Sequence, residues 1–279
     1  MISQELRLGS KQKAYELKNT IKNILKAEQR VVFNDENSND ISKNLLLFLT
    51  EKENIEGDLK FDSNISSFFT LHFFKQKDTK ASNQNKNTHT CKNHKLRGEV
   101  KSQANEIISF RNKYPKFAKH IRGIDAASSE TNARPEVFAQ AFRMLKNHQL
   151  RDNETLLKNY VVNNPLNITF HAGEDFFDIV DGLRYIDECL TFLDMQNGDR
   201  LGHAIALGID VQKYYALKKH KLLISKHTLL DNLSWTLSAI HKFGMKDHLS
   251  EAYRLENLFK ALYSEVYIAN IQRNKKVKS

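Results

Sequence analysis

The chain has 279 residues, 40% of them hydrophobic and 10% aromatic, which is enough for a sizeable core in one large domain or two small ones. No run of about 18 apolar residues occurs, so we expect no membrane contact. Residues 1–18 lack the apolar stretch of a signal peptide. The two cysteines, Cys91 and Cys189, do not make a disulfide framework and suit a reducing compartment. These features predict a cytoplasmic protein.

The chain is basic, with a formal net charge of +10. Such a charge is typical of proteins that bind nucleic acids. Lys and Asn are, however, abundant along the whole chain, and the one concentrated basic block is the tail Arg273–Lys278. A basic nucleic-acid-binding protein, whose affinity would fall with added salt, is therefore the least favoured alternative.

Residues 1–60 are expected to form an N-terminal helical segment, because Gln12–Ala27 carries apolar residues at helical spacing. A central region, residues 61–228, should begin with a buried strand at Ser67–Phe74. The polar stretch 78–95 is interpreted as a surface insert. It contains three potential metal ligands, His89, Cys91 and His94, without a fourth at a suitable spacing, so it predicts a metal site only weakly.

Strands and helices then alternate. Further short strands are predicted at Ile121–Ala127, Ile168–Phe170, Asp199–Gly202 and Lys221–Ser225. Helices are predicted over residues 96–114, after Pro135, over residues 176–193, and over 229–243 and 251–271 in a C-terminal helical extension, residues 229–279. Alternation of this kind predicts βαβ units and a parallel sheet, and hence an α/β fold.

A histidine follows each of two predicted strands. In His171-Ala172-Gly173-Glu174 the glycine permits a sharp turn, and a carboxylate lies three residues after the imidazole. His203 follows Gly202 in the same way. Imidazole is the commonest protein metal ligand, and a neighbouring carboxyl group can donate or accept a proton. Because α/β proteins place their chemistry at the carboxyl ends of strands, the pair predicts a site there.

The same residues carry a family resemblance. His171–Glu174 and Arg200–His203 resemble two signature motifs of the adenosine deaminase family, among the metal-dependent amidohydrolases. Gly123–Glu130, GIDAASSE, resembles that family's preceding strand motif, in the same order. The longer segments HAGEDFFDIVDGLRYIDE and GDRLGHAIALGID look closest to the deaminase subunit of bacterial RADAR anti-phage systems. The resemblance runs from about Phe68 to Trp235.

The resemblance implies a (β/α)₈ barrel with one zinc ion at its carboxyl face. It implies that His171 is a metal ligand, that Glu174 delivers a proton to the purine ring, and that His203 orients the attacking water. Ser128 and Gly173 match positions that contact the substrate. A metal-activated water would attack C6 of adenine and release ammonia. The implied substrates are adenosine, ATP or adenine in RNA.

The chain departs from the family pattern at the metal. It contains no HxH pair, which supplies two ligands from the family's first strand, and no aspartate pair resembling the one on its last strand. Ser128 stands where the family has glycine. One histidine does not hold a catalytic zinc, which takes three protein ligands. We therefore expect a partial (β/α)₈ barrel with helical insertions, a homo-oligomer or a complementing chain, and little activity alone. An inactive remnant or scaffold subunit is the alternative.

Overall fold

The computed structural model describes residues 2–33, 65–78, 92–152, 160–162 and 164–268. The chain divides into two compact units. The first unit comprises residues 1–171 and 189–202, and the second comprises residues 172–188 and 203–279.

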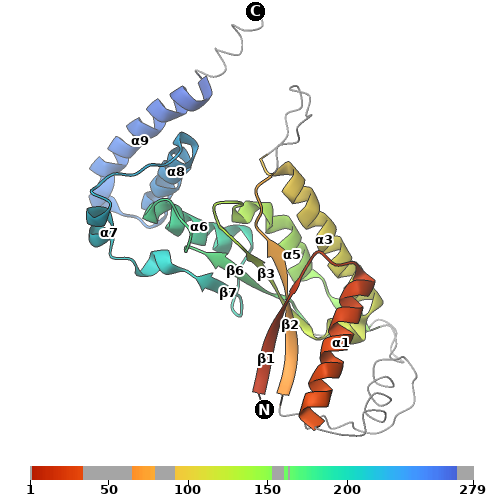
Figure 1. Cartoon of the computed structure of the whole chain (residues 1–279). Coiled ribbons are helices and arrows are strands. Elements are labelled where there is room, and N and C mark those ends of the chain that lie inside the picture. The colour runs from red at the N-terminus through yellow and green to blue at the C-terminus, as the bar shows by residue number, and fades with distance from the viewer. Residues whose placement is uncertain (1, 34–64, 79–91, 153–159, 163, 269–279) are drawn as a thin grey trace, which may run out of the picture. The chain divides into compact units, whose positions relative to one another are not determined.

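The first unit contains a parallel sheet of five strands in the order β1-β2-β3-β6-β7 (Figure 1). The strands are β1 (Ile2–Gly9), β2 (Ile65–Phe74), β3 (Ile121–Ala127), β6 (Asn167–Ala172) and β7 (Arg200–His203). In the register, Arg7 pairs with Thr70 and His72 pairs with Asp125. The α/β class and the parallel sheet predicted from the sequence are therefore confirmed.

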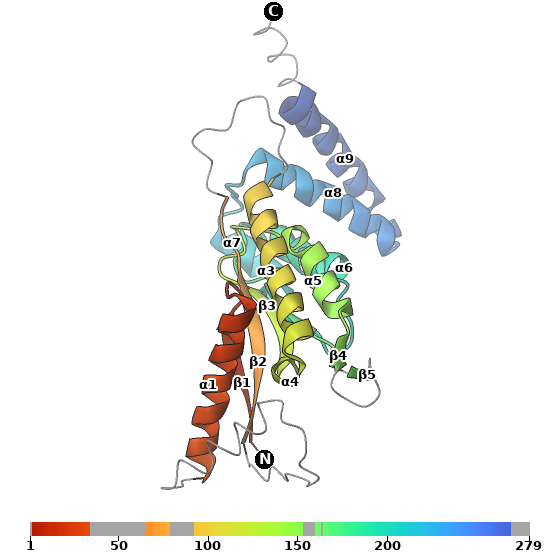
Figure 2. The ribbon, with the colours of Figure 1, turned by 90° about the vertical axis from the view of Figure 1, so that its right-hand side faces the viewer.

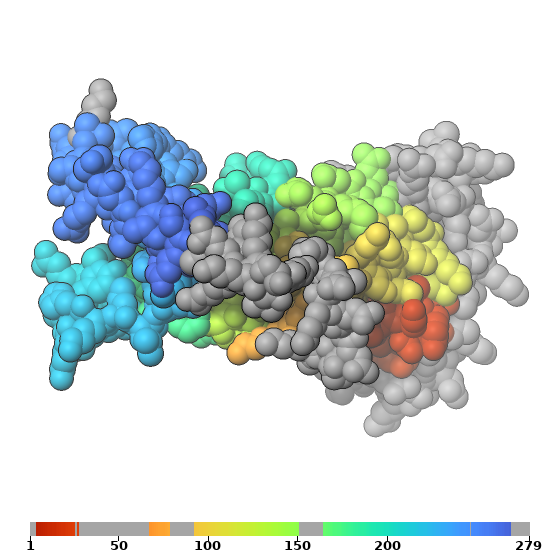
Figure 3. All heavy atoms as spheres, turned by 90° about the horizontal axis from the view of Figure 1, so that it is seen from above, coloured from red at the N-terminus to blue at the C-terminus, as the bar shows by residue number. Residues whose placement is uncertain are grey.

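Helices cover one face of this sheet. They are α1 (Ala14–Phe33), α3 (His94–Lys113), α4 (Pro115–Ala118), the short η1 (Pro135–Val137) and α5 (Ala139–Asn147). Figure 2 views the sheet from the side of α1, α3 and α5. The red spheres of α1 and the yellow spheres of α3 lie next to each other in Figure 3.

The core beneath the helices is built from alternate strand residues. Phe69, Leu71 and Phe73 of β2 are fully buried, as a strand with a period of two residues requires for one face. The Phe142 ring of α5 lies 5.1 Å from the Phe73 ring and 5.8 Å from the Phe170 ring of β6. Burying one such side chain contributes about 1.5–3 kcal/mol. This aromatic cluster fixes the helices on the sheet.

The opposite face of the sheet is concave. Glu5 lies on β1 and Arg200 on β7, at the two ends of the strand order. Four strand spacings would separate these strands by about 19 Å in a flat sheet, farther than two side chains can span. The Arg200 guanidinium nevertheless donates two hydrogen bonds of 3.0 Å to the Glu5 carboxylate. The sheet must therefore curl towards this face.

Two elements of the first unit differ from the sequence-based expectation. Residues 2–9, expected within a helical segment, form β1, because the parallel ladder with β2 satisfies their backbone groups. A short antiparallel hairpin, β4 (Leu150–Asp152) with β5 (Tyr160–Val162), was not predicted. The helix predicted at Gln12–Ala27 is present as α1. The basic tail and most of the polar insert, including His89 and Cys91, lie outside the described residues.

The second unit is mainly helical. It holds most of α6 (Ile179–Phe192), followed by η2 (Ile205–Gly208), α7 (Val211–Leu217), α8 (Lys226–Lys242), η3 (Lys246–His248), α9 (Leu249–Tyr263) and the π-helical η4 (Ser264–Ile268). Leu230 and Leu233 of α8 pack against Leu262 and Val266. The Trp235 indole donates to the Asp187 carboxylate at 2.9 Å, which ties α8 to α6.

The strand predicted at Lys221–Ser225 is wrong. These residues have no regular structure, and Leu223 is 96% exposed. The run is apolar but pairs with no strand among the described residues. Ser225, its last residue, caps α8 by accepting a hydrogen bond from the Thr228 backbone amide. Across the described ranges, no helix is both long enough and apolar enough to span a lipid bilayer.

Candidate functional site

Polar side chains line the concave face of the sheet in two layers. The inner layer joins Glu5 to Thr70, whose hydroxyl donates to the Glu5 carboxylate at 2.8 Å, and joins Arg200 to the Thr169 hydroxyl at 3.1 Å. The hydrogen bond from Arg200 lowers the pKa of Glu5; burial opposes this effect, and the hydrogen bond from the Thr70 hydroxyl adds to it. The same contact raises the pKa of Arg200. The opposite charges of Glu5 and Arg200 cancel in this layer. We therefore expect the reactive groups in the second layer.

The second layer lies nearer the carboxyl ends of the strands and is centred on Asp125. This carboxylate is fully buried at the end of β3. Its Oδ1 lies 3.0 Å from His171 Nδ1, and its Oδ2 lies 2.6 Å from His72 Nε2 and 2.8 Å from Arg7 Nη1. We call these four residues the Asp125 cluster. Burial of a carboxylate is costly unless it is paired, and here each oxygen has a partner.

A buried lysine supports the end of β6. The Lys75 side chain is almost fully buried, and its ammonium donates to the His171 carbonyl at 2.5 Å. The same nitrogen lies 4.7 Å from the centre of the Phe170 ring, within the range of a cation–π contact. Lys75 therefore holds the backbone of β6 at the point where the sequence motif begins.

The second unit brings together two of the residues predicted from the sequence. His203 Nε2 lies 3.2 Å from Glu174 Oε2. The Glu174 side chain is 26% exposed and the His203 side chain is 49% exposed, so both remain accessible to a ligand. A partly exposed carboxyl group held by an imidazole can exchange a proton with a bound molecule.

Backbone geometry at these motifs is unusual. Gly173 has φ +76°, and a Cβ atom there would lie 2.6 Å from Ile186 Cδ1, so the glycine is required by both conformation and space. Ser128 and His203 also have positive φ, at 82° and 63°. Non-glycine residues adopt this region rarely and are often found at functional sites when they do. Ser128 thus has a backbone that glycine would adopt without strain.

The predicted site residues fall into two groups. His171 belongs to the Asp125 cluster of the first unit, whereas Glu174 and His203 form their pair in the second unit. Their predicted roles, and those of Ser128 and Gly173 as substrate contacts, stay predictions. Three residues of the cluster were missed from the sequence: Arg7, His72 and Asp125. The available signal was alternation, since polar residues recur every second position in ELRL and FTLHF.

Zinc does not fit the described residues by themselves. In the part of the chain that the structure describes, no three His, Cys, Asp or Glu side chains are grouped to hold a metal ion. Around Asp125, an arginine lies at the carboxylate where a metal site would place a cation. The described residues thus supply one motif histidine and not the three ligands that a catalytic zinc takes.

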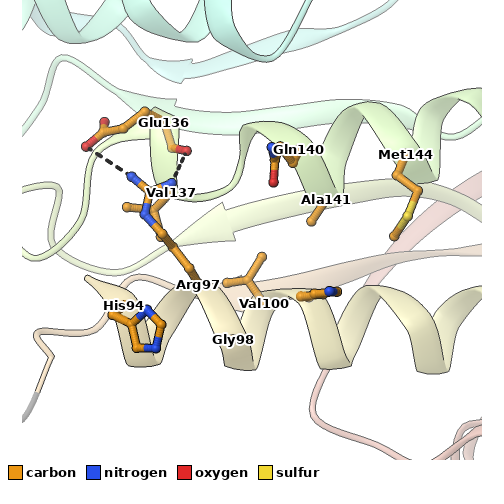
Figure 4. Close-up of a pocket in the computed structure, with 10 residues that line it drawn as sticks. His94, Arg97, Gly98, Val100, Glu136, Val137, Gln140, Ala141 and Met144 are labelled. Atoms are coloured by element: carbon orange, nitrogen blue, oxygen red, sulfur yellow. Dashed lines mark hydrogen bonds and ion pairs between the residues drawn. The ribbon is translucent and has the colours of Figure 1, made fainter. Parts of the chain in front are cut away.

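A separate groove lies in the first unit between α3 and the start of α5, with a volume of about 330 Å³ (Figure 4). Val100, Val137 and Ala141 form its apolar floor. Arg97 crosses it and donates to the Glu136 carbonyl at 2.9 Å. His94, one of the weak metal candidates, lies at its edge. None of its lining residues belongs to the Asp125 cluster or to the Glu174–His203 pair.

No protein-family model and no curated protein matches the chain. Among solved structures, the chain is similar to an adenine deaminase from Arthrobacter aurescens, with a TM-score of 0.31 and 16% sequence identity. The match covers 54% of this chain and 31% of that chain, so this chain spans less than a third of the length of that deaminase.

Proposed function

We propose that this chain is an adenosine deaminase-like protein that supplies the purine-binding side of a deaminase site. One observation carries the proposal. The three strands that end in the resembling motifs, β3, β6 and β7, are neighbours in one parallel sheet, so their carboxyl ends share one edge. The Glu174–His203 pair, 3.2 Å apart, follows two of these ends and is accessible.

The strong curl of the sheet supports a partial (β/α)₈ barrel as the architecture. The ion pair between Glu5 and Arg200 draws the edge strands β1 and β7 together across the concave face. Parallel sheets are usually covered on both faces, and a polar face is expected where the sheet wraps a site. The concave face then corresponds to the interior of the barrel.

Hydrolytic deamination adds water at C6 of adenine and releases ammonia, giving hypoxanthine. In our proposal the Glu174 carboxyl group donates a proton to a purine ring nitrogen, which makes C6 more electrophilic. His203 holds that carboxyl group in place through their contact and orients the attacking water. Because zinc does not fit the described residues, no step is assigned to it. We propose a zinc ion only for an assembly in which another chain or a further copy adds ligands.

Adenosine, ATP and adenine in RNA are all proposed substrates, and a role in anti-phage defence follows from the resemblance alone. A non-catalytic scaffold subunit is the second candidate. The incomplete ligand set among the described residues favours it. Adenosine binding separates the two, because a scaffold has no need of a purine site.

The test is calorimetric titration of the full chain with adenosine. We expect the wild-type chain to bind and Glu174→Gln to bind roughly 2- to 10-fold more weakly, since a hydrogen bond from a protonated carboxyl group to a neutral ring nitrogen contributes about 0.5–1.5 kcal/mol. Asp175→Asn is the matched control, because Asp175 is the adjacent exposed acid, and it should bind like wild type. Equal binding by Glu174→Gln, or no binding by wild type, would reject the purine site.

A further inference from the structure

Helix α9 of the second unit packs against α8 through one of its faces. The two helices lie side by side in Figures 1 and 2. The α9 and η4 side chains in this contact recur every three or four residues, as a helix face requires; they are Leu255, Phe259, Leu262 and Val266.

A second stripe with the same spacing is exposed on α9 and η4. It comprises six residues, which we call the α9 stripe: Leu249, Tyr253, Glu256, Lys260, Tyr263 and Tyr267. Tyr253 is 67% exposed, and the other three apolar side chains of the stripe are exposed as well. The Tyr263 and Tyr267 rings lie 5.0 Å apart, so the stripe continues from α9 into η4. Alternating separations of three and four residues are typical of a surface that packs against another helix.

The stripe borders a groove of about 480 Å³ between α8 and α9. Leu249 and Tyr253 line the groove from α9, and Leu237 and His241 line it from α8. A groove between two helices can receive the side chains of a third helix, provided that the third helix presents large residues at matching intervals.

The order of residues along the α9 stripe indicates what faces it. Glu256 and Lys260 stand at its centre, and large apolar side chains stand on both sides of them. Tyr253 and Tyr263 are equally far from the midpoint between the two charges, and so are the two end residues of the stripe. In a two-fold symmetric contact, residue i faces residue j and residue j faces residue i. An antiparallel second copy of the stripe would therefore place apolar side chains against apolar ones and Glu256 against Lys260.

We propose that the α9 stripe is a self-association surface, on which α9 of a second copy of this chain packs antiparallel about a two-fold axis. Within one chain, the Lys260 ammonium lies 2.7 Å from the Glu256 carboxylate. In the dimer each of these charges also faces the opposite charge of the second copy. Such complementarity sets register and orientation, and burial of the tyrosine rings supplies affinity. The inference concerns assembly and does not rest on the proposed deaminase site.

The experiment is sedimentation velocity of the full chain over a range of concentrations, with two charge reversals. Lys260→Glu places like charges opposite Glu256 of the second copy, and Glu256→Lys does the same opposite Lys260. We expect a wild-type dimer and a dissociation constant raised roughly 100-fold in each variant, because like-charge contacts occur twice in the interface. An equimolar mixture of the two variants should dimerise again, since each central contact then joins opposite charges.

Two further variants complete the test. Arg254→Glu is the matched control, because Arg254 is an exposed charge of α9 outside the stripe, and it should dimerise like wild type. Tyr253→Ser changes no charge and should also weaken the dimer, so it serves where circular dichroism shows that a charge reversal fails to fold. A wild-type chain that is monomeric at every concentration would overturn the proposal. So would a dimer that Lys260→Glu and Tyr253→Ser leave unchanged, or folded charge variants that do not associate when mixed. Adenosine binding is not a readout, so failure here is distinct from failure of the proposed function.

Discussion

The two faces of the five-stranded sheet are built from adjacent residues but differ in how they are stabilised. Phe73 of β2 is fully buried under α5, whereas Phe74 is 43% exposed and His72 contacts a buried carboxylate on the concave face. The apolar face is held by non-directional packing. The concave face is held by a few directional contacts to Glu5 and Asp125. Substitutions on the apolar face should therefore alter the stability of the first unit, and substitutions on the concave face should alter its polar contacts.

Phe73→Ala, on the apolar face, should cause the largest loss of stability. Deleting a fully buried aromatic ring that contacts Phe142 is expected to lower the free energy of unfolding by about 3–5 kcal/mol. Chemical denaturation followed by circular dichroism measures the change. Phe74→Ala, in the same strand but half-exposed, should cost about 0.5 kcal/mol. Equal losses in the two variants would contradict the division of the sheet into a packed face and an open one.

Gly173→Ala should have an intermediate effect. Its positive φ, together with a Cβ only 2.6 Å from Ile186, is expected to cost about 1–3 kcal/mol and to displace the turn that carries Glu174. Thermal unfolding and adenosine titration measure the two consequences. Gly98→Ala in α3 meets no atom within 4 Å and should instead stabilise the chain by about 0.5–1 kcal/mol. A neutral Gly173→Ala would show that the turn is not constrained as described.

Glu5→Gln should have the smallest effect, and it should depend on pH. Because Arg200 lowers the pKa of Glu5 in the fold, the contact stabilises the chain above the ordinary pKa of about 4.5 and is lost as pH falls through the lower folded value. The Arg200 side chain is 55% exposed, so the contribution at neutral pH should be below about 1 kcal/mol. Denaturation of both proteins across pH 3 to 7 measures it. A difference that grows on acidification would contradict the assigned contact.

The sequence predicted those parts of the fold in which local pattern and tertiary structure agree. The strands near 67, 121, 168 and 199 and the helices between them are where apolar spacing placed them. It did not predict β1, because ISQELRLG has little apolar content and depends on β2 for its hydrogen bonds. It wrongly predicted a strand at 221–225, because an apolar run does not supply its own partner. Strand pairing depends on two segments together, so it cannot be predicted from the sequence of either segment alone.

The candidate site shows the same limit. The histidines and the glutamate stood out because each follows a strand, and the resemblance singled out the same positions. Asp125 lay inside a quoted motif without a role, and Arg7 and His72 were not singled out at all. These three meet only because β1, β2 and β3 are neighbours in the sheet. Alternating polar residues in each strand are the signal that would have pointed to one shared face.

The central claim is that a purine binds beside the strand ends and not elsewhere on the chain. The most direct test is to follow backbone amide shifts of the labelled full chain during titration with adenosine. We expect the largest changes at Gly173, Glu174 and His203, and their loss in Glu174→Gln. Changes confined to the groove between α3 and α5 (Figure 4), or no changes at any adenosine concentration, would contradict the account.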